Sequence, residues 1–386
     1  MKNQQLGVLA LAGMIVLAGC GGGGSITGGC TSNCGGGGGG GTPTITMAAK
    51  NKKNLQNCGG ASYTYAATAS SGGITWSLDN ANLGTINATT GVVTADCSTN
   101  FVAGVTGNVV ATSTTDSSVS AKSPVTLVNQ VVYNLGGATL ADVDTWVANA
   151  DGTDAAKILS NGCINPNYFA GHVAYACNGN YEADNNQAQI FSVDGAEPAT
   201  LTTTLTFPTL ENIQYVTPSP DGKLLLFKAY DPKATKWGDY TANADGTNLQ
   251  ALLEEAVCTG GCLGISQAHW NHAGTLIVYD HIVNDQYTLW TMNADGSNKT
   301  QLVTGGISGV FDAEDKTIYF DNGVNIYSVP VSGGDPTLWK SGVLLPTQSP
   351  DGTKIAYSVG ISVWVANTTD GSDPQQILTG TDTVSW

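Results

Sequence analysis

Residues 219–227 of the chain read SPDGKLLLF, and residues 240–246 read YTANADG. Each stretch joins an Asp-Gly turn to an apolar or alternating run, which predicts a β-hairpin. The two stretches recur at 271–279 (NHAGTLIVY) with 290–296 (WTMNADG), and at 349–357 (SPDGTKIAY) with 364–371 (WVANTTDG). A repeated unit with room for four strands is typical of a β-propeller blade, so this repeat decides the fold.

Weaker copies of the repeat lie between the clear ones. The second turn of each copy contains one anchor residue, and successive anchors are 37 to 51 residues apart. The anchors are Asp151, Asp194, Asp245, Asp295, Ser332 and Asp370. Six anchors predict six blades within residues 130–386. The first copy begins at its second strand, residues 131–133. The chain ends with 383–386 (TVSW), which matches the first-strand ending 268–270 (AHW). We therefore expect the C-terminal strand to complete the first blade, which leaves no long open sheet edge.

The turn sequences SPDG and NADG resemble the repeat of TolB-like (WD40-like) propellers, and the resemblance covers residues 130–386. It implies the propeller fold and a general mode of action, in which one propeller face docks on a partner in the cell envelope. A fold of this kind hosts many activities, so function has to come from particular residues.

The first 19 residues have the pattern of a secretory signal peptide. Lys2 precedes an apolar stretch, 6–17, that is too short to span a bilayer. The stretch ends in LAGC at 17–20, which resembles the lipobox of bacterial lipoproteins. This resemblance implies cleavage before Cys20, lipidation of its sulfur and, because Gly21 follows, sorting to the outer membrane on its periplasmic or cell-surface side. An ordinary secreted protein is the alternative. The glycine-rich residues 20–42 predict a flexible tether.

Nine cysteines occur in the chain. Once Cys20 is lipidated, an even number remains in an oxidising compartment, where disulfides persist. Neighbours in sequence predict four local disulfides: Cys30–Cys34, Cys58–Cys97, Cys163–Cys177 and Cys258–Cys262. No Cys-x-x-Cys pair is present, so a metal or redox site is the weaker alternative.

Residues 43–129 contain short alternating runs and no helical period, which predicts a β-sandwich. The runs 74–78 (ITWSL), 84–87 (GTIN) and 90–95 (TGVVTA) resemble the group 2 bacterial immunoglobulin-like domain. The resemblance implies a spacer or adhesive module. We expect Trp76 to lie in its core.

The composition excludes several classes of function. Charged residues make up 11% of the chain, the net charge is −16, and the 14 basic residues are all lysines. A nucleic-acid-binding surface needs basic patches, and a bidentate clamp on a carboxylate or phosphate needs arginine. We expect no nucleic-acid partner.

Catalytic and metal motifs are weak. The sequence has no Gly-x-Ser-x-Gly elbow, and the carboxylates Glu182, Glu254 and Glu255 are candidates by residue type alone. The Asp-Gly pairs are interpreted as hairpin turns, since no twelve-residue calcium loop occurs. The histidines at 269 and 272 are expected to diverge, whereas zinc needs three or four converging ligands. We expect no catalytic residue, metal or cofactor.

The remaining candidate is a surface formed by the loops opposite the Asp-Gly turns, because loops on a rigid scaffold commonly carry function. Its candidate residues are Tyr181, Glu182, Asp184, Asp231, Lys236, Trp237 and His281, with His269 lining the channel. The sequence therefore predicts a monomeric, non-catalytic binding module or scaffold for an envelope protein or glycan. An extracytoplasmic enzyme acting on polysaccharide or peptide, or a surface adhesin, stays as the alternative.

Overall fold

A computed structural model of the chain describes residues 42–49, 51, 54–56, 62–95, 104–136, 143–160, 166–169, 172–175, 186–192, 200–256, 268–283, 286–381 and 384–386. These segments are built from strands, together with one short 3-10 helix, η1 (Ala81–Leu83). None of the helical structure in the described segments is long and apolar enough to span a bilayer. The predicted all-β fold is confirmed.

Residues 45–128 form a sandwich of small sheets. The strands are β1 (Ile45–Met47), β2 (Asn54–Gln56), β3 (Ser62–Thr64), β4 (Ala67–Ala69), β5 (Ile74–Leu78), β6 (Thr85–Ile86), β7 (Val92–Thr94), β8 (Thr106–Ser113) and β9 (Ser120–Val128). One sheet has the order β2-β9-β8-β5, a second the order β3-β7-β6, and β1 pairs with β4. Trp76 of the first sheet and Val93 of the second share one buried core, so Trp76 packs inside the sandwich as expected.

Residues 130–386 form six blades, numbered here in chain order. Blade 1 holds β10 (Gln130–Gly136), β11 (Val143–Asn149) and β12 (Ala156–Ser160); blade 2 holds β13 (Pro166–Phe169), β14 (His172–Tyr175), β15 (Gln187–Ser192) and β16 (Thr200–Thr206); blade 3 holds β17 (Glu211–Pro218), β18 (Leu224–Asp231), β19 (Lys236–Asn243) and β20 (Gln250–Ala256). Blade 4 holds β21 (His269–Trp270), β22 (Leu276–Val283), β23 (Gln286–Asn293) and β24 (Thr300–Thr304); blade 5 holds β25 (Ile307–Phe311), β26 (Thr317–Asp321), β27 (Asn325–Pro330) and β28 (Thr337–Ser341); blade 6 holds β29 (Leu344–Gln348), β30 (Lys354–Val359), β31 (Ser362–Asn367) and β32 (Gln375–Thr379).

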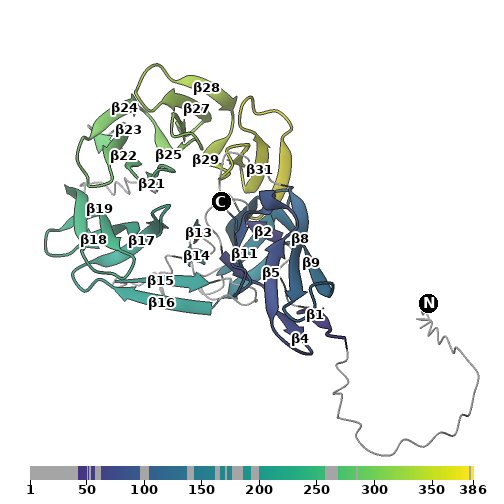
Figure 1. Cartoon of the computed structure of the whole chain (residues 1–386). Helices are drawn as coiled ribbons and strands as arrows, with labels where there is room; N and C mark the ends of the chain where they lie inside the picture. Colours follow the sequence, from purple (N-terminus) through teal and green to yellow (C-terminus); the bar gives the residue numbers. More distant parts are fainter. Residues whose placement is uncertain are drawn as a thin grey trace, which may run out of the picture. The chain divides into compact units, whose positions relative to one another are not determined.

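The blades follow one another around a ring, and in blades 2 to 6 the first strand lies innermost (Figure 1). We call the packed interface between neighbouring blades a seam. Along the second strand of each blade, alternate side chains face the preceding and the following blade. In blade 3, for example, Phe227 packs toward blade 2, whereas Leu226 packs toward Ile277 of blade 4. Whether a side chain occupies an odd or an even position along the second strand therefore decides which of the two neighbouring seams it packs into.

The C-terminus closes the ring as predicted. Val132 of β10 and Ser385 exchange two backbone hydrogen bonds of 2.8 and 2.9 Å, so the end of the chain takes the place of the missing first strand of blade 1, beside β10. Trp386 is buried, and its Nε1 donates to the carbonyl oxygen of Thr347 in blade 6 at 3.0 Å. Trp270 makes the equivalent bond to Thr217 in blade 3 at 3.1 Å. The match between residues 384–386 and 268–270 therefore extends to a shared contact.

The Asp-Gly turns between the third and fourth strands stabilise themselves. Asp245 Oδ1 accepts from the backbone nitrogen and the hydroxyl of Thr247 at 2.9 and 2.6 Å, and Asp295 binds Ser297 in the same way. Gly246 has a φ of 82°, a conformation that favours glycine. These aspartates cap their own hairpins, as the sequence interpretation expected.

Candidate functional site

The described candidate residues of blades 3 and 4 lie in strands. Asp231 ends β18, Lys236 and Trp237 begin β19, and His281 lies within β22. The sequence interpretation had placed these residues in connecting loops. The strands are longer because the cross-strand pairing continues to Asp231 with Lys236 and to Val283 with Gln286, which leaves a short turn at each site.

The turns between the second and third strands carry exposed apolar side chains on three consecutive blades. Val324 in the turn of blade 5 and Ile361 in the turn of blade 6 are 62% and 73% exposed. Val359 ends β30 next to the turn of blade 6, Tyr287 lies near the start of β23 in blade 4, and both are exposed. Isolated exposed hydrophobics are ordinary, but several at equivalent turns of one face form a candidate contact surface. We call these four residues the turn patch.

Blade 3 ends on the same side in an aromatic and charged corner. The rings of Tyr230 and Trp237 lie 5.6 Å apart between centroids, and Lys228 Nζ lies 5.4 Å from the Trp237 ring. Lys236 forms a 3.7 Å ion pair with Glu254 that stays partly exposed to solvent. Among the predicted binding residues, the structure thus brings Lys236 and Trp237 together with Glu254, which the sequence had raised only as a carboxylate.

Beneath this corner lies a buried pair of opposite formal charge. Lys228 on β18 is the direct cross-strand partner of Asp239 on β19, and the two are 8% and 1% exposed. Burial lowers the pKa of Lys228. Burial also raises the pKa of Asp239 to about 7, assisted by the buried carboxyl of Asp280 and opposed by Lys228. Burial favours the neutral form of both side chains, because a low dielectric disfavours charge.

Asp321 occupies the position of Lys228 in blade 5, with a different result. Its carboxylate accepts from the backbone nitrogens of Gly323 at 2.9 Å and Leu345 at 3.0 Å. Leu345 has a φ of 54° at a bulge in the first strand of blade 6, and Ser308 of blade 5 has the same conformation. Asp321 therefore holds the inner strand of the next blade in a strained shape. Burial raises its pKa.

Two of the three histidines of blade 4, His269 and His281, lie in a poorly solvated setting. His269 is partly exposed in the innermost strand, β21, and burial lowers its pKa to about 4. Burial also lowers the pKa of His281, whose ring lies 6.1 Å from that of Trp290. Both side chains are therefore neutral imidazoles near pH 7.

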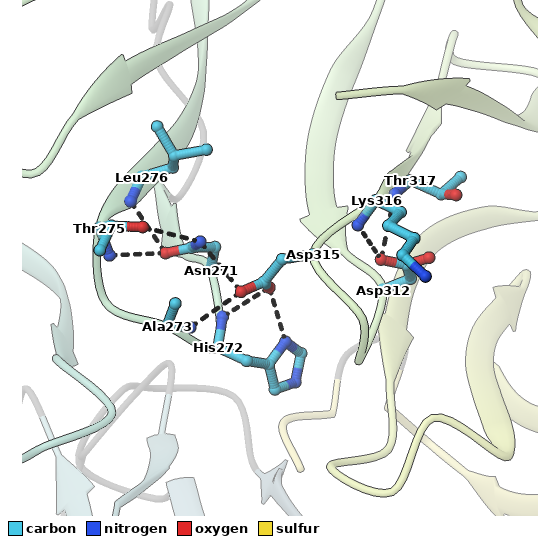
Figure 2. A network of polar contacts seen from close by, with 9 residues as sticks. All are labelled: Asn271, His272, Ala273, Thr275, Leu276, Asp312, Asp315, Lys316 and Thr317. Atoms are coloured by element: carbon cyan, nitrogen blue, oxygen red, sulfur yellow. Dashed lines mark hydrogen bonds and ion pairs between the residues drawn. The ribbon is translucent and has the colours of Figure 1, made fainter. Parts of the chain in front are cut away.

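His272 lies on the opposite face, in a network between blades 4 and 5 (Figure 2). Asp315 of blade 5 accepts from Asn271 Nδ2, from the backbone nitrogens of His272 and Ala273, and contacts His272 Nδ1 at 3.2 Å. In blade 3, Asp221 of the same turn stabilises the turn from within. Blade 4 has Ala273 at that position, so the aspartate comes from its neighbour. The histidine serves a turn rather than a metal.

The other candidates lie outside the described residues. These are the nine cysteines with their predicted lipidation and disulfides, and the loop residues Tyr181, Glu182 and Asp184. In the part of the chain that the structure does describe, no group of three or more His, Cys, Asp or Glu side chains is arranged to hold a metal ion.

The sequence interpretation did not single out Lys228, Asp239, Asp280 or Asp321. A signal was present in the repeats. Lys228, Asp280 and Asp321 fall at the fifth position of the second strand in blades 3, 4 and 5, next to the aromatic residues Phe227, Tyr279 and Phe320. A charged residue at an otherwise apolar strand centre indicates a group with a specific partner.

Comparison with known proteins supports the fold. No family model and no curated protein matches the sequence. Among solved structures, TolB from Acinetobacter baumannii is similar with a TM-score of 0.53 and 15% identity, over 74% of this chain and 80% of that one. A protein assigned as TolB from Agrobacterium tumefaciens has a TM-score of 0.49 at 15% identity, over 64% and 87%. A protein assigned as a 6-phosphogluconolactonase from Bacteroides fragilis has a TM-score of 0.42 at 14%, over 64% and 81%. At these identities the likeness concerns the propeller fold alone.

Proposed function

We propose that this chain is a non-catalytic binding protein of the bacterial envelope, anchored through lipid on Cys20, and that its propeller binds a protein partner with the turn patch. The observation that carries the proposal is the exposure of Val324 and Ile361 in equivalent turns of blades 5 and 6, with Val359 and Tyr287 at the strand ends that flank such turns in blades 6 and 4. These blades are rigidly paired sheets, so the turns are held in place before any partner binds.

The chemistry of the turn patch favours a protein over a sugar. The turns at residues 321–325 and 358–362 expose no charged side chain, because Asp321 is buried. Branched aliphatic side chains without neighbouring charge match the centre of a protein interface, which is depleted in charged residues. The ion pair Lys236–Glu254 of blade 3 lies at the border of this face, where a polar rim is expected.

The predicted lipid anchor at Cys20 fits the proposed binding role. A lipidated Cys20 followed by a glycine-rich tether would hold the propeller near a membrane while leaving its faces free to bind. Replacement of Cys20 by Ser is expected to move the protein from the membrane fraction to the soluble fraction and to abolish labelling by fatty acid. Persistent labelling would exclude this anchor.

The binding surface is tested by cross-linking in intact cells that carry the tagged full-length chain. The triple variant V324S/V359S/I361S is expected to lower the yield of the captured envelope protein by about tenfold or more, the equivalent of about 1.4 kcal/mol. The matched control L249S/L338S changes two exposed hydrophobic residues outside the turn patch and is expected to preserve capture. Equal capture by the triple variant and the wild type would overturn the proposal.

A further inference from the structure

The turn between the second and third strands of blade 5 contains an Asn-Gly pair. Asn322 and Gly323 are exposed and directly precede Val324 of the turn patch, whereas Asp321, the last residue of β26, is buried. An asparagine that precedes glycine can lose its side-chain amide, because the backbone nitrogen of the glycine reaches the side-chain carbonyl carbon and closes a ring. Glycine has no Cβ to hinder this attack. The turn therefore contains the two groups that such a reaction needs.

The carboxylate of Asp321 is placed to act as a general base on the glycine nitrogen. Its Oδ1 accepts a hydrogen bond from the backbone nitrogen of Gly323 at 2.9 Å, which is within the distance for direct proton transfer. The backbone nitrogen of Leu345 donates to Oδ2 at 3.0 Å and fixes the orientation of the carboxylate. Burial raises the pKa of Asp321, so its carboxylate is a stronger base than an exposed one.

The side-chain carbonyl of Asn322 is held by two donors. Its Oδ1 accepts from the backbone nitrogens of Val324 at 3.1 Å and Asn325 at 2.9 Å. Negative charge develops on this oxygen when a nucleophile adds to Cγ, and backbone N–H groups at such distances stabilise that charge. The bond from the backbone nitrogen of Asn322 to the carbonyl oxygen of Asn325, at 3.1 Å, closes the turn. Nucleophile, base and oxyanion donors are therefore in place before any reaction begins.

We propose that Asn322 is a self-modifying site that converts to aspartate or isoaspartate through a succinimide formed with Gly323. The nitrogen of Gly323 gives its proton to Asp321 and bonds to Cγ of Asn322. The bond from Cγ to Nδ2 then breaks, and Nδ2 leaves as ammonia with the proton that Asp321 had taken. A water molecule from solvent adds to one of the two ring carbonyl carbons, the bond from that carbon to the glycine nitrogen breaks, and the nitrogen regains a proton. Water is the only co-reactant.

The modification also regulates the turn patch, and this part of the inference rests on the proposed function. The unmodified turn exposes no charged side chain at residues 321–325. Either product carries a carboxylate beside Val324, and isoaspartate also lengthens the main chain by one carbon atom. An unpaired charge opposes binding at the centre of a protein interface, which is depleted in charged residues. Conversion of Asn322 therefore weakens the contact between the turn patch and its partner.

The sandwich contains a matched asparagine that should keep its amide. Asn87 Oδ1 accepts from the backbone nitrogens of Thr89 at 2.9 Å and Thr90 at 3.0 Å, as Asn322 Oδ1 does from its own turn. The next residue is Ala88, whose Cβ hinders attack by its nitrogen. Among the described residues, no carboxylate accepts a hydrogen bond from that nitrogen. The two asparagines therefore separate the effect of the paired donors from that of the nucleophile and the base.

Peptide mapping by mass spectrometry tests the modification in the folded full-length protein, incubated at neutral pH and sampled over time. Digestion after lysine places Asn322 on peptide 317–340 and Asn87 on peptide 54–122. The Asn-Gly pairs at 161–162 and 178–179 lie outside the described residues and are read separately on peptide 158–223. A sample taken at time zero corrects for deamidation during digestion.

The expected result is a rate comparison. Asn322 should exchange its amide for a carboxylate at least about tenfold faster in the folded protein than in a synthetic peptide of residues 317–327, because only the fold supplies the base and both donors. Asn87 should remain intact over the same period. A rate for Asn322 in the folded protein that is equal to or below that in the peptide would overturn the proposal.

The variant D321N tests the base. It keeps the shape of the side chain and an acceptor oxygen for the glycine nitrogen but removes the basic carboxylate, so the modification should slow by about tenfold or more. An unchanged rate in D321N would overturn the role of Asp321.

The regulatory effect is tested in the cross-linking assay. N322D introduces the charge directly and should lower capture by about tenfold, whereas the uncharged control N322S should preserve it. Full capture by N322D together with lost capture in V324S/V359S/I361S would overturn the regulation and leave the proposed function standing. Full capture by the triple variant would overturn the proposed function and the regulation with it, while the peptide map decides the modification independently.

Discussion

Two seams of the propeller use the same contact in different settings. In the closing seam between blades 6 and 1, Trp386 donates to Thr347, and in the seam between blades 3 and 4, Trp270 donates to Thr217. The closing seam has an apolar core that contains Tyr133 and Val365. The seam between blades 3 and 4 has an apolar core of its own but also contains Lys228 and Asp239.

The difference follows from how the chain passes through each seam. Blades 3 and 4 are consecutive in the chain, so the polypeptide keeps them together even when their side chains separate. Blade 1 is assembled from the two ends of the propeller, since residues 384–386 continue from blade 6 and are held to β10 only by non-covalent contacts. The closing blade therefore depends on apolar burial and satisfied hydrogen bonds, whereas the seam between two complete blades tolerates the buried polar side chains of Lys228 and Asp239.

The largest effect is expected from removing residues 384–386. The truncation deletes buried Trp386 and the two backbone hydrogen bonds between Ser385 and Val132. We expect the free energy of unfolding to fall by about 5 kcal/mol or more, from about 3–5 for the tryptophan and about 1 for each hydrogen bond. The measurement is chemical denaturation followed by fluorescence.

The matched variant W270A removes the equivalent contact from the continuous seam. It is expected to cost about 3–5 kcal/mol, less than the truncation. A truncated chain that is more stable than W270A would show that the C-terminal strand does not hold the ring closed.

The second effect concerns the residue at the fifth position of the second strand, Lys228 in one seam and Ser358 in the other. K228A removes the buried amine across the strand pair from the Asp239 carboxyl, and we expect a loss of about 1–3 kcal/mol, the cost of disturbing a buried polar group. S358A removes a buried hydroxyl from the closing seam and is expected to cost about 1 kcal/mol, the typical effect of a point substitution. If both variants lose the same stability in urea titrations, the charged pair makes no difference between the seams.

The third effect is a pH dependence of the free energy of unfolding that comes from His269. In the match between residues 268–270 and 384–386, His269 corresponds to Ser385 of the closing seam. The folded pKa of His269, about 4, lies below the unfolded value of about 6.5. The unfolded state therefore binds more protons between these values. The contribution of His269 is complete above pH 6.5 and is lost as the pH falls toward 4, by roughly 1–3 kcal/mol.

The swap H269S should remove this acid-side loss, which unfolding curves at pH 7 and pH 4.5 would reveal. The reverse swap, S385H, should introduce such a loss at the closing seam. An H269S protein that loses as much stability on acidification as the wild type would assign the effect to other groups.

The smallest effect on stability is expected in the closing seam on the side of the propeller that carries the Asp-Gly turns. Asn129 Nδ2 donates to Asp351 of blade 6 at 3.0 Å, and Asn129 is buried. N129A should cost about 1–2 kcal/mol, since the variant removes a hydrogen bond from a buried site. K316A, which disrupts the exposed ion pair with Glu314, is the control and should leave the denaturation midpoint unchanged. A shift of the midpoint in K316A equal to that in N129A would contradict this ranking.

Much of the fold could be predicted because it depends on local pattern. Asp-Gly turns and alternating strands recur in the sequence, and each specifies its own hairpin without reference to distant residues. The closure by residues 384–386 was predictable for the same reason, since they repeat the pattern of 268–270. The assignment of residues 43–129 to the immunoglobulin-like family, the disulfides and the lipid anchor stay predictions.

The candidate sites were less predictable because they arise where blades meet. Lys236, Trp237 and His281 were expected in loops, but cross-strand pairing extends β19 and β22 through them. Asp315 stabilises the turn of another blade, and no local pattern in its own turn indicates this. The turn patch is likewise formed by short turns far apart in the chain.

The sequence by itself determined the six repeats, the order of the strands and the residues that close the ring, because turns and strand alternation are written in consecutive residues. The tertiary structure decided which side chains share a seam, and so which charges are buried together. Burial is a property of the packed neighbours rather than of the residue. The sequence Phe227-Lys228-Ala229 contains a lysine in an apolar run, but only the packing of blade 4 against blade 3 turns that lysine and Asp239 into a desolvated pair.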